Sequence, residues 1–269
     1  MNKFDAVNQH YLLNEQYKDA SNLNTRLGII QRLSAEPVDW YQWIFSFIKP
    51  APRCRVLELG CGPGNLWRRN LERIPPDWEI TLSDFSPGML KDAQANLSQS
   101  GRKFAFQVID AQSIPFENAH FDRLIANLML YHVPDRPRTF AEISRVLKPD
   151  GFFYAATVSD AAFAELEKWM GRVGMASWSD ALGFSIENGM EQLTRWFSHV
   201  ELHHLKHELV VTEADSLMEV IRSGTPKGEY DEATFQRLRD LIEYDLVQHG
   251  PIHMNMEIGL FEAAGKQAT

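Results

Sequence analysis

The sequence has few of the features that mark secreted, membrane-spanning or nucleic-acid-binding proteins. Only two of its 269 residues are cysteine, Cys54 and Cys61, which is too few for a disulfide framework and suits a reducing compartment. The first sixteen residues lack the apolar segment of a signal peptide. Apolar stretches such as 151–158 fall far short of the ~20 residues of a membrane helix. We therefore expect a soluble, cytoplasmic protein without a membrane partner.

An excess of basic residues is also missing. Lys and Arg number 27 against 36 Asp and Glu, for a formal net charge of −9. The imbalance lies in residues 160–269, because residues 1–159 carry nearly equal numbers of both signs. An acidic surface disfavours a phosphate backbone as partner, so we expect no nucleic-acid ligand.

The composition that remains is typical of a globular protein. Hydrophobic residues make up 44% and charged residues 23% of the chain. The length suits one large domain, or one domain with a cap. No internal repeat or low-complexity tract is visible.

Strand and helix patterns alternate through the middle of the chain. We predict strands at 55–59, 79–82, 104–109, 121–128 and 152–158, and helices at 65–74, 88–99 and 138–147. A structural turn is expected at 147–151, where Pro149 and Gly151 stop the preceding helix. Such alternation indicates an α/β fold, with a parallel sheet and helices on both faces.

The flanking regions differ from this pattern. Residues 1–51 contain a polar segment and an apolar helical pattern at 40–48, and we expect them to form a lid or cap. The central part, 52–158, is expected to form the core. Residues 159–269 would complete the sheet with a helical insert that forms an acceptor pocket. In this last part we predict helices at 161–170, 190–197, 214–222 and 231–247, and strands at 200–211 and 252–261. The two late strands suggest an antiparallel edge.

A glycine-rich loop follows the first predicted strand, with the sequence E-L-G-C-G-P-G from Glu58 to Gly64. Glycines let the backbone turn tightly and approach a ligand, and ligands of parallel sheets bind beyond the carboxyl ends of the strands. The spacing differs from the G-x-G-x-x-G pattern of dinucleotide-binding proteins. The carboxylate of Glu58 would suit a ligand with positive charge and would repel a pyrophosphate.

Polar residues also end the next three predicted strands. Asp84 lies 20 residues beyond Gly64, where an acid can accept hydrogen bonds from both hydroxyls of a ribose. Phe85 follows it and could pack on an adenine ring. Asp110 could accept from an adenine amino group, and Asn127 ends the fourth strand. Each residue alone could be a turn or helix cap, but four at successive strand ends indicate a site.

In combination these motifs resemble those of class I S-adenosylmethionine (SAM) methyltransferases, of the small-molecule type that includes the ubiquinone/menaquinone C-methyltransferases. The resemblance lies within 52–158. It is carried by E-L-G-C-G-P-G, S-D-F-S-P-G-M-L, V-I-D-A-Q-S-I-P-F, F-D-R-L-I-A-N-L-M-L-Y-H-V-P-D and R-V-L-K-P-D-G. It implies a Rossmann-like, doubly wound, mostly parallel seven-stranded sheet with an antiparallel edge strand and a helical cap.

The resemblance also implies that SAM is the cofactor and S-adenosylhomocysteine (SAH) the product. Gly60 and Gly62 would line the methionine part, with Cys61 between them, and Glu58 would face its ammonium group. Asp84 would hold the ribose. The residues implied around the adenine are Phe85, Met89, Asp110 and Ala111, and Asn127 would lie under the methionine part near the acceptor.

The lid offers three further candidates. Tyr11, Tyr17 and Arg26 could close over the site, and Arg26 could pair with the SAM carboxylate. Ordinary surface packing is the alternative for each of them.

His132 is the candidate catalytic base if the acceptor must lose a proton, although it could equally be a structural residue of the turn after the fourth strand. No metal site is expected. His203 and His207 share a face of a predicted strand but would stand roughly 13 Å apart.

We therefore expect in-line methyl transfer from SAM to an O, N or C nucleophile of a small molecule, by a monomer or homodimer. The Asp/Asn-Pro-Pro-Tyr motif of nucleic-acid amino-methyltransferases is absent, since residues 127–130 read N-L-M-L. Three alternatives remain open: an NAD(P)-dependent oxidoreductase, a SAM enzyme that transfers another group, and a non-catalytic SAM-binding protein.

Overall fold

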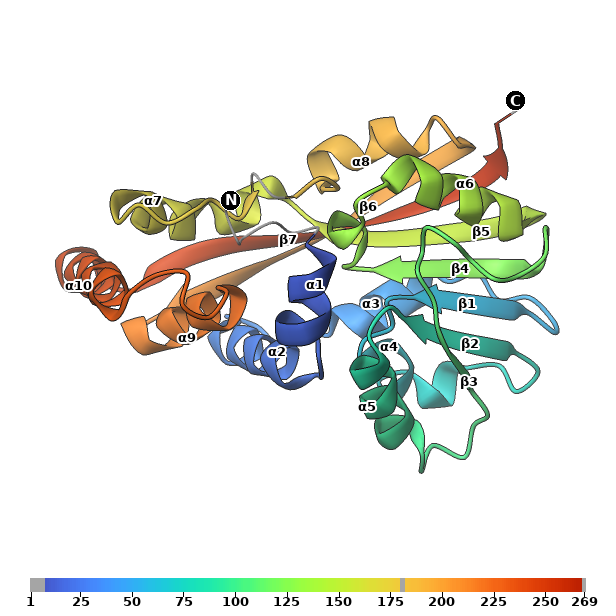
Figure 1. Cartoon of the computed structure of the whole chain (residues 1–269), viewed down its shortest axis with the longest axis horizontal. Coiled ribbons are helices and arrows are strands. Elements are labelled where there is room, and N and C mark those ends of the chain that lie inside the picture. The colour runs from blue at the N-terminus through green and yellow to red at the C-terminus, as the bar shows by residue number, and fades with distance from the viewer. Residues whose placement is uncertain (1–7, 180–181, 268–269) are drawn as a thin grey trace.

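A seven-stranded sheet runs through the whole molecule (Figure 1). The computed structural model describes residues 8–179 and 182–267. The strand order is β3-β2-β1-β4-β5-β7-β6. The strands are β1 (Arg55–Leu59), β2 (Glu79–Asp84), β3 (Ala105–Val108), β4 (Phe121–Asn127), β5 (Leu147–Val158), β6 (Phe197–Val211) and β7 (Ile252–Lys266).

The first five strands are parallel, and β7 is antiparallel to both of its neighbours. The predicted Rossmann-like, mostly parallel sheet is therefore confirmed. The reversed strand lies one position inside the edge, since β6 is the edge strand and pairs with β7.

Helices cover both faces because strand side chains alternate between them. Val56 and Ile125 join the hydrophobic core on one face, whereas Leu57 and Leu124 join the core on the other. The first face carries α3 (Trp40–Phe47), α4 (Asn65–Arg68) and α5 (Pro87–Leu97), and the second carries α6 (Arg136–Val146) and α8 (Ile186–Leu193).

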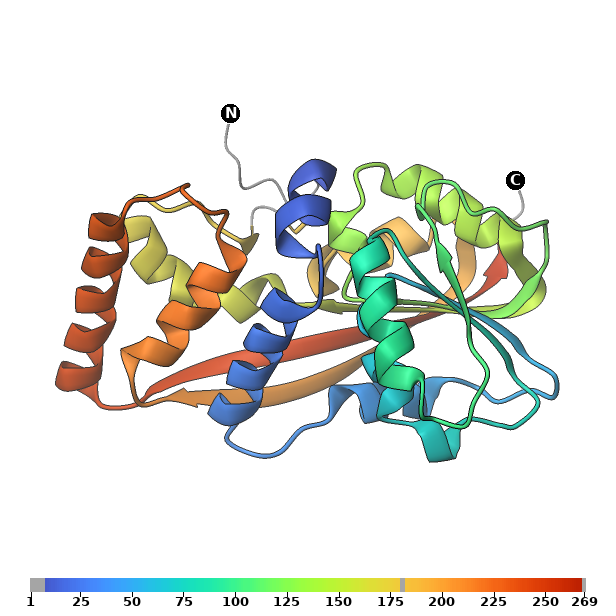
Figure 2. The ribbon, with the colours of Figure 1, turned by 60° about the horizontal axis from the view of Figure 1, so that its bottom comes forward.

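Beyond the parallel part of the sheet, β6 and β7 continue as a long antiparallel ribbon (Figure 2). This ribbon carries α7 (Ala164–Arg172), α9 (Ala214–Gly224) and α10 (Glu232–His249). The N-terminal segment forms α1 (Gln9–Tyr11), the π-helix η1 (Leu12–Gln16) and α2 (Ser21–Leu33). Helix α2 packs on α9, and the Ala35 N–H donates to the Glu208 carbonyl of β6.

Three predicted elements were wrong in extent. The helix expected at 65–74 ends at Arg68, because the Asn70 side chain turns back and donates to the Leu66 and Tyr41 carbonyls. A short 3-10 turn at Leu71–Arg73 follows it. The helix expected at 190–197 lies at Ile186–Leu193, where a capping box at Ser185 starts it.

The turn expected at 147–151 lies inside β5. Leu147 pairs with Phe121, but the next registered pair is Phe152 with Arg123. The chain therefore bulges between the two pairs, which accommodates Pro149 within a strand.

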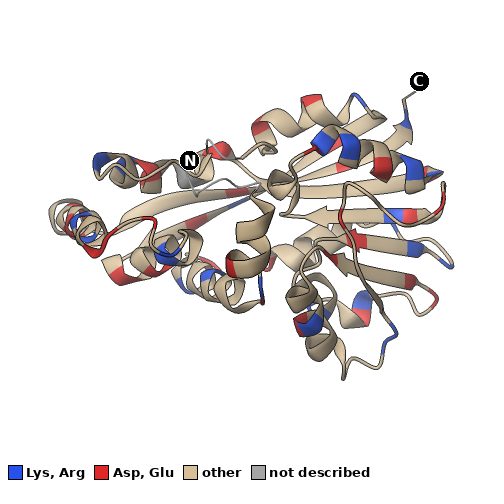
Figure 3. Ribbon diagram, viewed as in Figure 1, with Lys and Arg blue, Asp and Glu red and all other residues tan. Residues whose placement is uncertain are grey.

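Lys and Arg are interspersed with Asp and Glu along the helices, strands and loops of the chain (Figure 3). Among the helices of residues 8–179 and 182–267, none is both long and apolar enough to cross a membrane.

Candidate functional site

A cavity of ≈ 360 Å³ opens where β1, β2 and β4 end and the N-terminal helices cover the sheet. The strand ends and the lid both line it, and so do α9 and β7. Every site residue predicted from the sequence lines this cavity. These residues are Tyr17, Arg26, Glu58, Gly60, Cys61, Gly62, Asp84, Phe85, Met89, Asp110, Ala111, Asn127 and His132.

The glycine loop needs its glycines for two physical reasons. Gly60 and Gly62 have φ of 64° and 53°, in the left-handed region that side chains disfavour. A Cβ on Gly60 would also lie 2.8 Å from the Cβ of Met129. The loop therefore folds tightly beneath the residues that follow β4.

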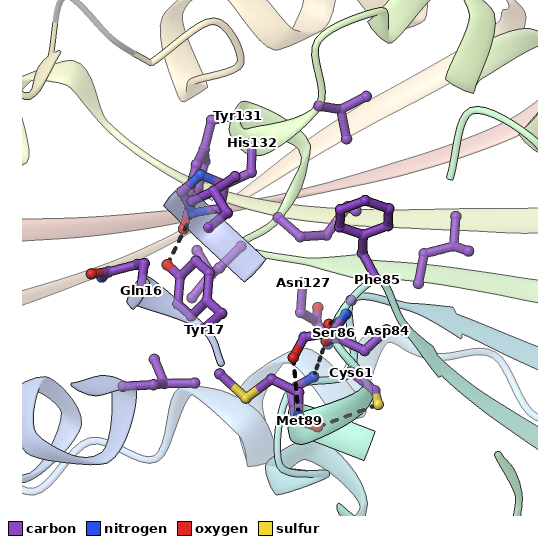
Figure 4. A pocket seen from close by; sticks show the side chains of 18 of the residues that line it. Gln16, Tyr17, Cys61, Asp84, Phe85, Ser86, Met89, Asn127, Tyr131 and His132 are labelled. Atoms are coloured by element: carbon purple, nitrogen blue, oxygen red, sulfur yellow. Dashed lines mark hydrogen bonds between the residues drawn. The ribbon is translucent and has the colours of Figure 1, made fainter. Parts of the chain in front are cut away.

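The Asp84 carboxylate anchors this loop. One oxygen accepts from the Gly62 N–H at 2.9 Å and the other from the Ser86 N–H at 2.8 Å (Figure 4). Burial raises the pKa of Asp84 to about 6, against these hydrogen bonds, which lower it. Each carboxylate oxygen has a second lone pair, so Asp84 can still accept from a ligand in the cavity.

Glu58 lies below the loop as part of a buried trio. Its carboxylate accepts from the Trp67 indole N–H at 2.6 Å and from the Asn127 amide N–H at 3.0 Å. Only 1% of the residue is exposed, and burial raises the pKa of Glu58 to about 7. Glu58 thus has two protein partners in addition to the cavity that it lines.

Asn127 has one oxygen left over. Its Oδ1 is buried and finds no donor among the described residues, although Asn127 lines the cavity. The next residue, Leu128, has a φ of 52°, which is strained for a branched side chain. The Asn127 Oδ1 atom at the end of β4 is therefore an open hydrogen-bond acceptor at the cavity wall.

The residues predicted around an adenine ring form another part of the wall. Met89 is buried, and its N–H donates to the Ser86 hydroxyl, which caps α5. The Asp110 carboxylate accepts from the backbone and side-chain N–H groups of Gln112. Phe85 also lines the cavity (Figure 4).

The lid reaches the site through Tyr17 and Arg26. The Tyr17 hydroxyl and His132 Nε2 share a hydrogen bond of 2.9 Å, which joins the lid to the turn after β4 (Figure 4). Arg26 donates to the Ser223 carbonyl of α9 at 3.0 Å and to the Tyr17 hydroxyl at 3.4 Å. The Tyr11 hydroxyl instead donates to Gln16.

The sequence analysis missed several lining residues. Ser86 carried a usable signal, since a Ser before Pro commonly caps a helix. Tyr131 lies within the motif at 121–135 but was not singled out, and Trp178 and Gln16 line the cavity from segments without a motif.

The surroundings of Cys61 and of the histidines of β6 indicate structural roles. Burial raises the pKa of the Cys61 thiol well above its usual range, which disfavours a reactive thiolate. His203 stacks on Phe47 and His204 contacts Glu257, and the described residues contain no cluster that could hold a metal ion.

Comparison with known proteins favours one interpretation of this site. Residues 56–151 match the family model of a methyltransferase domain. A ubiquinone/menaquinone biosynthesis C-methyltransferase of Bordetella parapertussis is 35% identical over 100 residues, covering 37% of this chain and 39% of the relative. Over its glycine loop and central strands the chain is similar to class I SAM-dependent methyltransferases. SAM is the cofactor of this family.

Other methyltransferases share more of the chain. A malonyl-[acyl-carrier protein] O-methyltransferase of Geobacter sulfurreducens is 31% identical over 155 residues, 58% of this chain and 53% of that protein. The chain thus spans about two fifths to one half of these relatives. Phosphoethanolamine N-methyltransferase 2 of Haemonchus contortus has the same fold, with a TM-score of 0.60 and 18% identity over 96% of this chain and 60% of its own. The [4+2]-cyclase SpnF also has it, with a TM-score of 0.53 and 18% identity over 84% of this chain and 80% of its own.

Proposed function

We propose that this protein moves the methyl group of SAM to a small-molecule acceptor. The observation that carries the proposal is a single cavity with two unlike ends. One end consists of the glycine loop, Asp84 and Asn127, and the other consists of apolar side chains from the lid, α9 and β7. A cofactor and an acceptor could therefore meet inside one enclosure.

The residues of the first end fit SAM. The buried Asn127 Oδ1 needs a donor, and the ammonium group of the methionine part can supply it. Asp84 has lone pairs left for two ribose hydroxyls. Gly60 and Gly62 line the cavity without a side chain, so their backbone groups can contact the methionine part.

SAM supplies a methyl group already activated by its sulfonium, so the protein's task is alignment and exclusion of water. The lid covers the cavity and is fastened to α9 by Arg26. The pair of Tyr17 and His132 lies between the lid and the strand ends. For an acceptor with a hydroxyl group, His132 Nε2 would take up the proton, either directly or through the Tyr17 hydroxyl.

The proposal is tested by following the methyl group itself. SAM with a deuterated methyl group is incubated with the protein and a panel of small phenols, amines and acids. The masses of the products are then determined by mass spectrometry. We expect one acceptor class to gain the labelled methyl group, and Asp84→Asn to abolish the gain. Asp150→Asn, a change of the same kind at an exposed site, should have no effect. SAM binding with no labelled product from any acceptor, or a product that carries another part of SAM, would contradict methyl transfer.

A further inference from the structure

The end of the cavity away from the glycine loop is apolar. We call it the apolar end and define it by Leu27 of α2, Val220 and Gly224 of α9, Trp178, and Met256 and Ile258 of β7. None of these side chains carries a charge. They come from four segments that meet only in the folded chain, since α2 packs on α9 and both lie over the ribbon of β6 and β7.

Charge is scarce near the apolar end. Arg26 is the one Lys or Arg side chain among the described residues that line the cavity. Its guanidinium already donates to the Ser223 carbonyl and the Tyr17 hydroxyl. The acidic side chains of the lining, Glu58, Asp84 and Asp110, belong to the strand ends. A charged acceptor would therefore lose its hydration in the apolar end without gaining a counter-ion, which is strongly unfavourable.

An aromatic wall bounds this end. The Trp178 indole lies directly against Gly224, where an added Cβ would be 2.8 Å from its Cζ2 atom. Glycine at this position therefore lets the ring pack close to α9. Trp178 is half-buried, so the indole offers apolar ring surface to the cavity that it lines.

Hydrogen-bonding groups of the lid and of the turn after β4 lie close together. Gln16, Tyr17, Tyr131 and His132 stand together on the lid side of the cavity, across from Asn127 and Asp84 (Figure 4). A ligand with one polar group could direct it there and leave the rest of its surface against the apolar end.

We infer that the apolar end binds an uncharged, aromatic acceptor with its single polar group toward Tyr17 and His132. This inference rests on the proposed function, which it deepens by naming the substrate class. It excludes phosphorylated and zwitterionic acceptors, for which the apolar end has no counter-charge.

The test uses two probes that share one aromatic ring system and differ by a charged phosphate group, 2-naphthol and 2-naphthyl phosphate, titrated calorimetrically into the protein saturated with SAH. We expect 2-naphthol to bind about tenfold or more tightly than its phosphate. Trp178→Ala should weaken 2-naphthol binding about tenfold, while Trp178→Phe should restore it to within about threefold. Gly224→Ala, which forces the indole to move, should weaken it as well. Gly171→Ala, at an exposed helical glycine with open space around it, is the matched control.

The outcomes separate this inference from the proposed function. Absence of SAH binding would overturn the proposed function. Normal SAH binding with equal affinity for both probes, or with 2-naphthol binding that Trp178→Ala leaves unchanged, would overturn the assignment of the apolar end alone.

Discussion

At the scale of single residues, two buried carboxyl groups determine which ligand suits the glycine loop. Asp84 and Glu58 both lie at the glycine loop, and burial raises the pKa of each. Ionised carboxyl groups in such a place disfavour the folded state unless hydrogen bonds or a cation compensate. A ligand with hydroxyl groups and an ammonium group would stabilise both ionised forms, so the site is suited to such a ligand before it binds.

The raised pKa of Glu58 predicts that the stability of the protein depends on pH. This pKa rises from 4.5 to about 7 on folding, so folding favours the protonated form. The free energy of unfolding should therefore fall as pH rises from about 4.5 to about 7. Glu58→Gln, which cannot ionise, should lose this dependence. The free energy of unfolding of this variant, relative to that of the wild type, should therefore rise by about 2–3 kcal/mol between pH 5 and pH 7.5.

Urea unfolding of the protein without ligand at both pH values measures this difference. Glu72→Gln, at an exposed glutamate, is the control and should follow the wild type. Parallel pH dependences for wild type and Glu58→Gln would show that Glu58 does not titrate in this range.

His132 makes a prediction for catalysis. If its Nε2 takes a proton from a hydroxyl acceptor, His132→Ala should lower turnover about 10²- to 10³-fold, with SAH affinity within about threefold of wild type. Tyr17→Phe should have a smaller effect, because the imidazole remains. Steady-state kinetics with the first acceptor found, combined with calorimetry, provides the comparison. Unchanged turnover in His132→Ala would remove it from the catalytic residues.

At the scale of elements, the lid depends on close contact with α5. The Lys18 carbonyl lies so near Gly88 that an added Cβ would overlap it. The Ala20 N–H donates to Asp92 of the same helix at 2.8 Å. These contacts hold residues 17–20 on α5 and so place Tyr17 and Arg26.

Gly88→Ala should therefore displace the lid without removing a lining side chain. We expect SAH to bind about tenfold more weakly and the lid to be cleaved faster by protease. The Gly171→Ala variant controls for the substitution itself. Wild-type affinity together with wild-type cleavage in Gly88→Ala would mean that the contact with Lys18 does not position the lid.

The elements also show which parts of the fold can be predicted from sequence. The limits of β1 could be predicted from the local alternation of strand and helix patterns. The place of Asp84 at the end of β2 could be predicted from its distance along the chain from the glycine loop. The early end of α4 could not, because it depends on a contact between Asn70 and the distant Tyr41. The bulge in β5 depends on its register with β4, which no local pattern reveals.

At the scale of the whole molecule, the sheet joins the two ends of the cavity. The parallel strands supply the glycine loop and Asp84, and the long β7 supplies Met256 and Ile258. That the residues of the glycine-loop end lie together could be predicted, because they cluster within 58–127 of the chain. The apolar end could not be predicted, since Trp178 and Gly224 meet only through tertiary packing.

The most direct test of the account is calorimetric titration of the protein with SAM, SAH and NADH. We predict micromolar binding of SAM and SAH, no binding of NADH, and loss of SAH binding in Asp84→Ala, with Asp150→Ala as the exposed control. Binding of NADH without SAM or SAH would contradict the assignment of the glycine loop and favour an oxidoreductase.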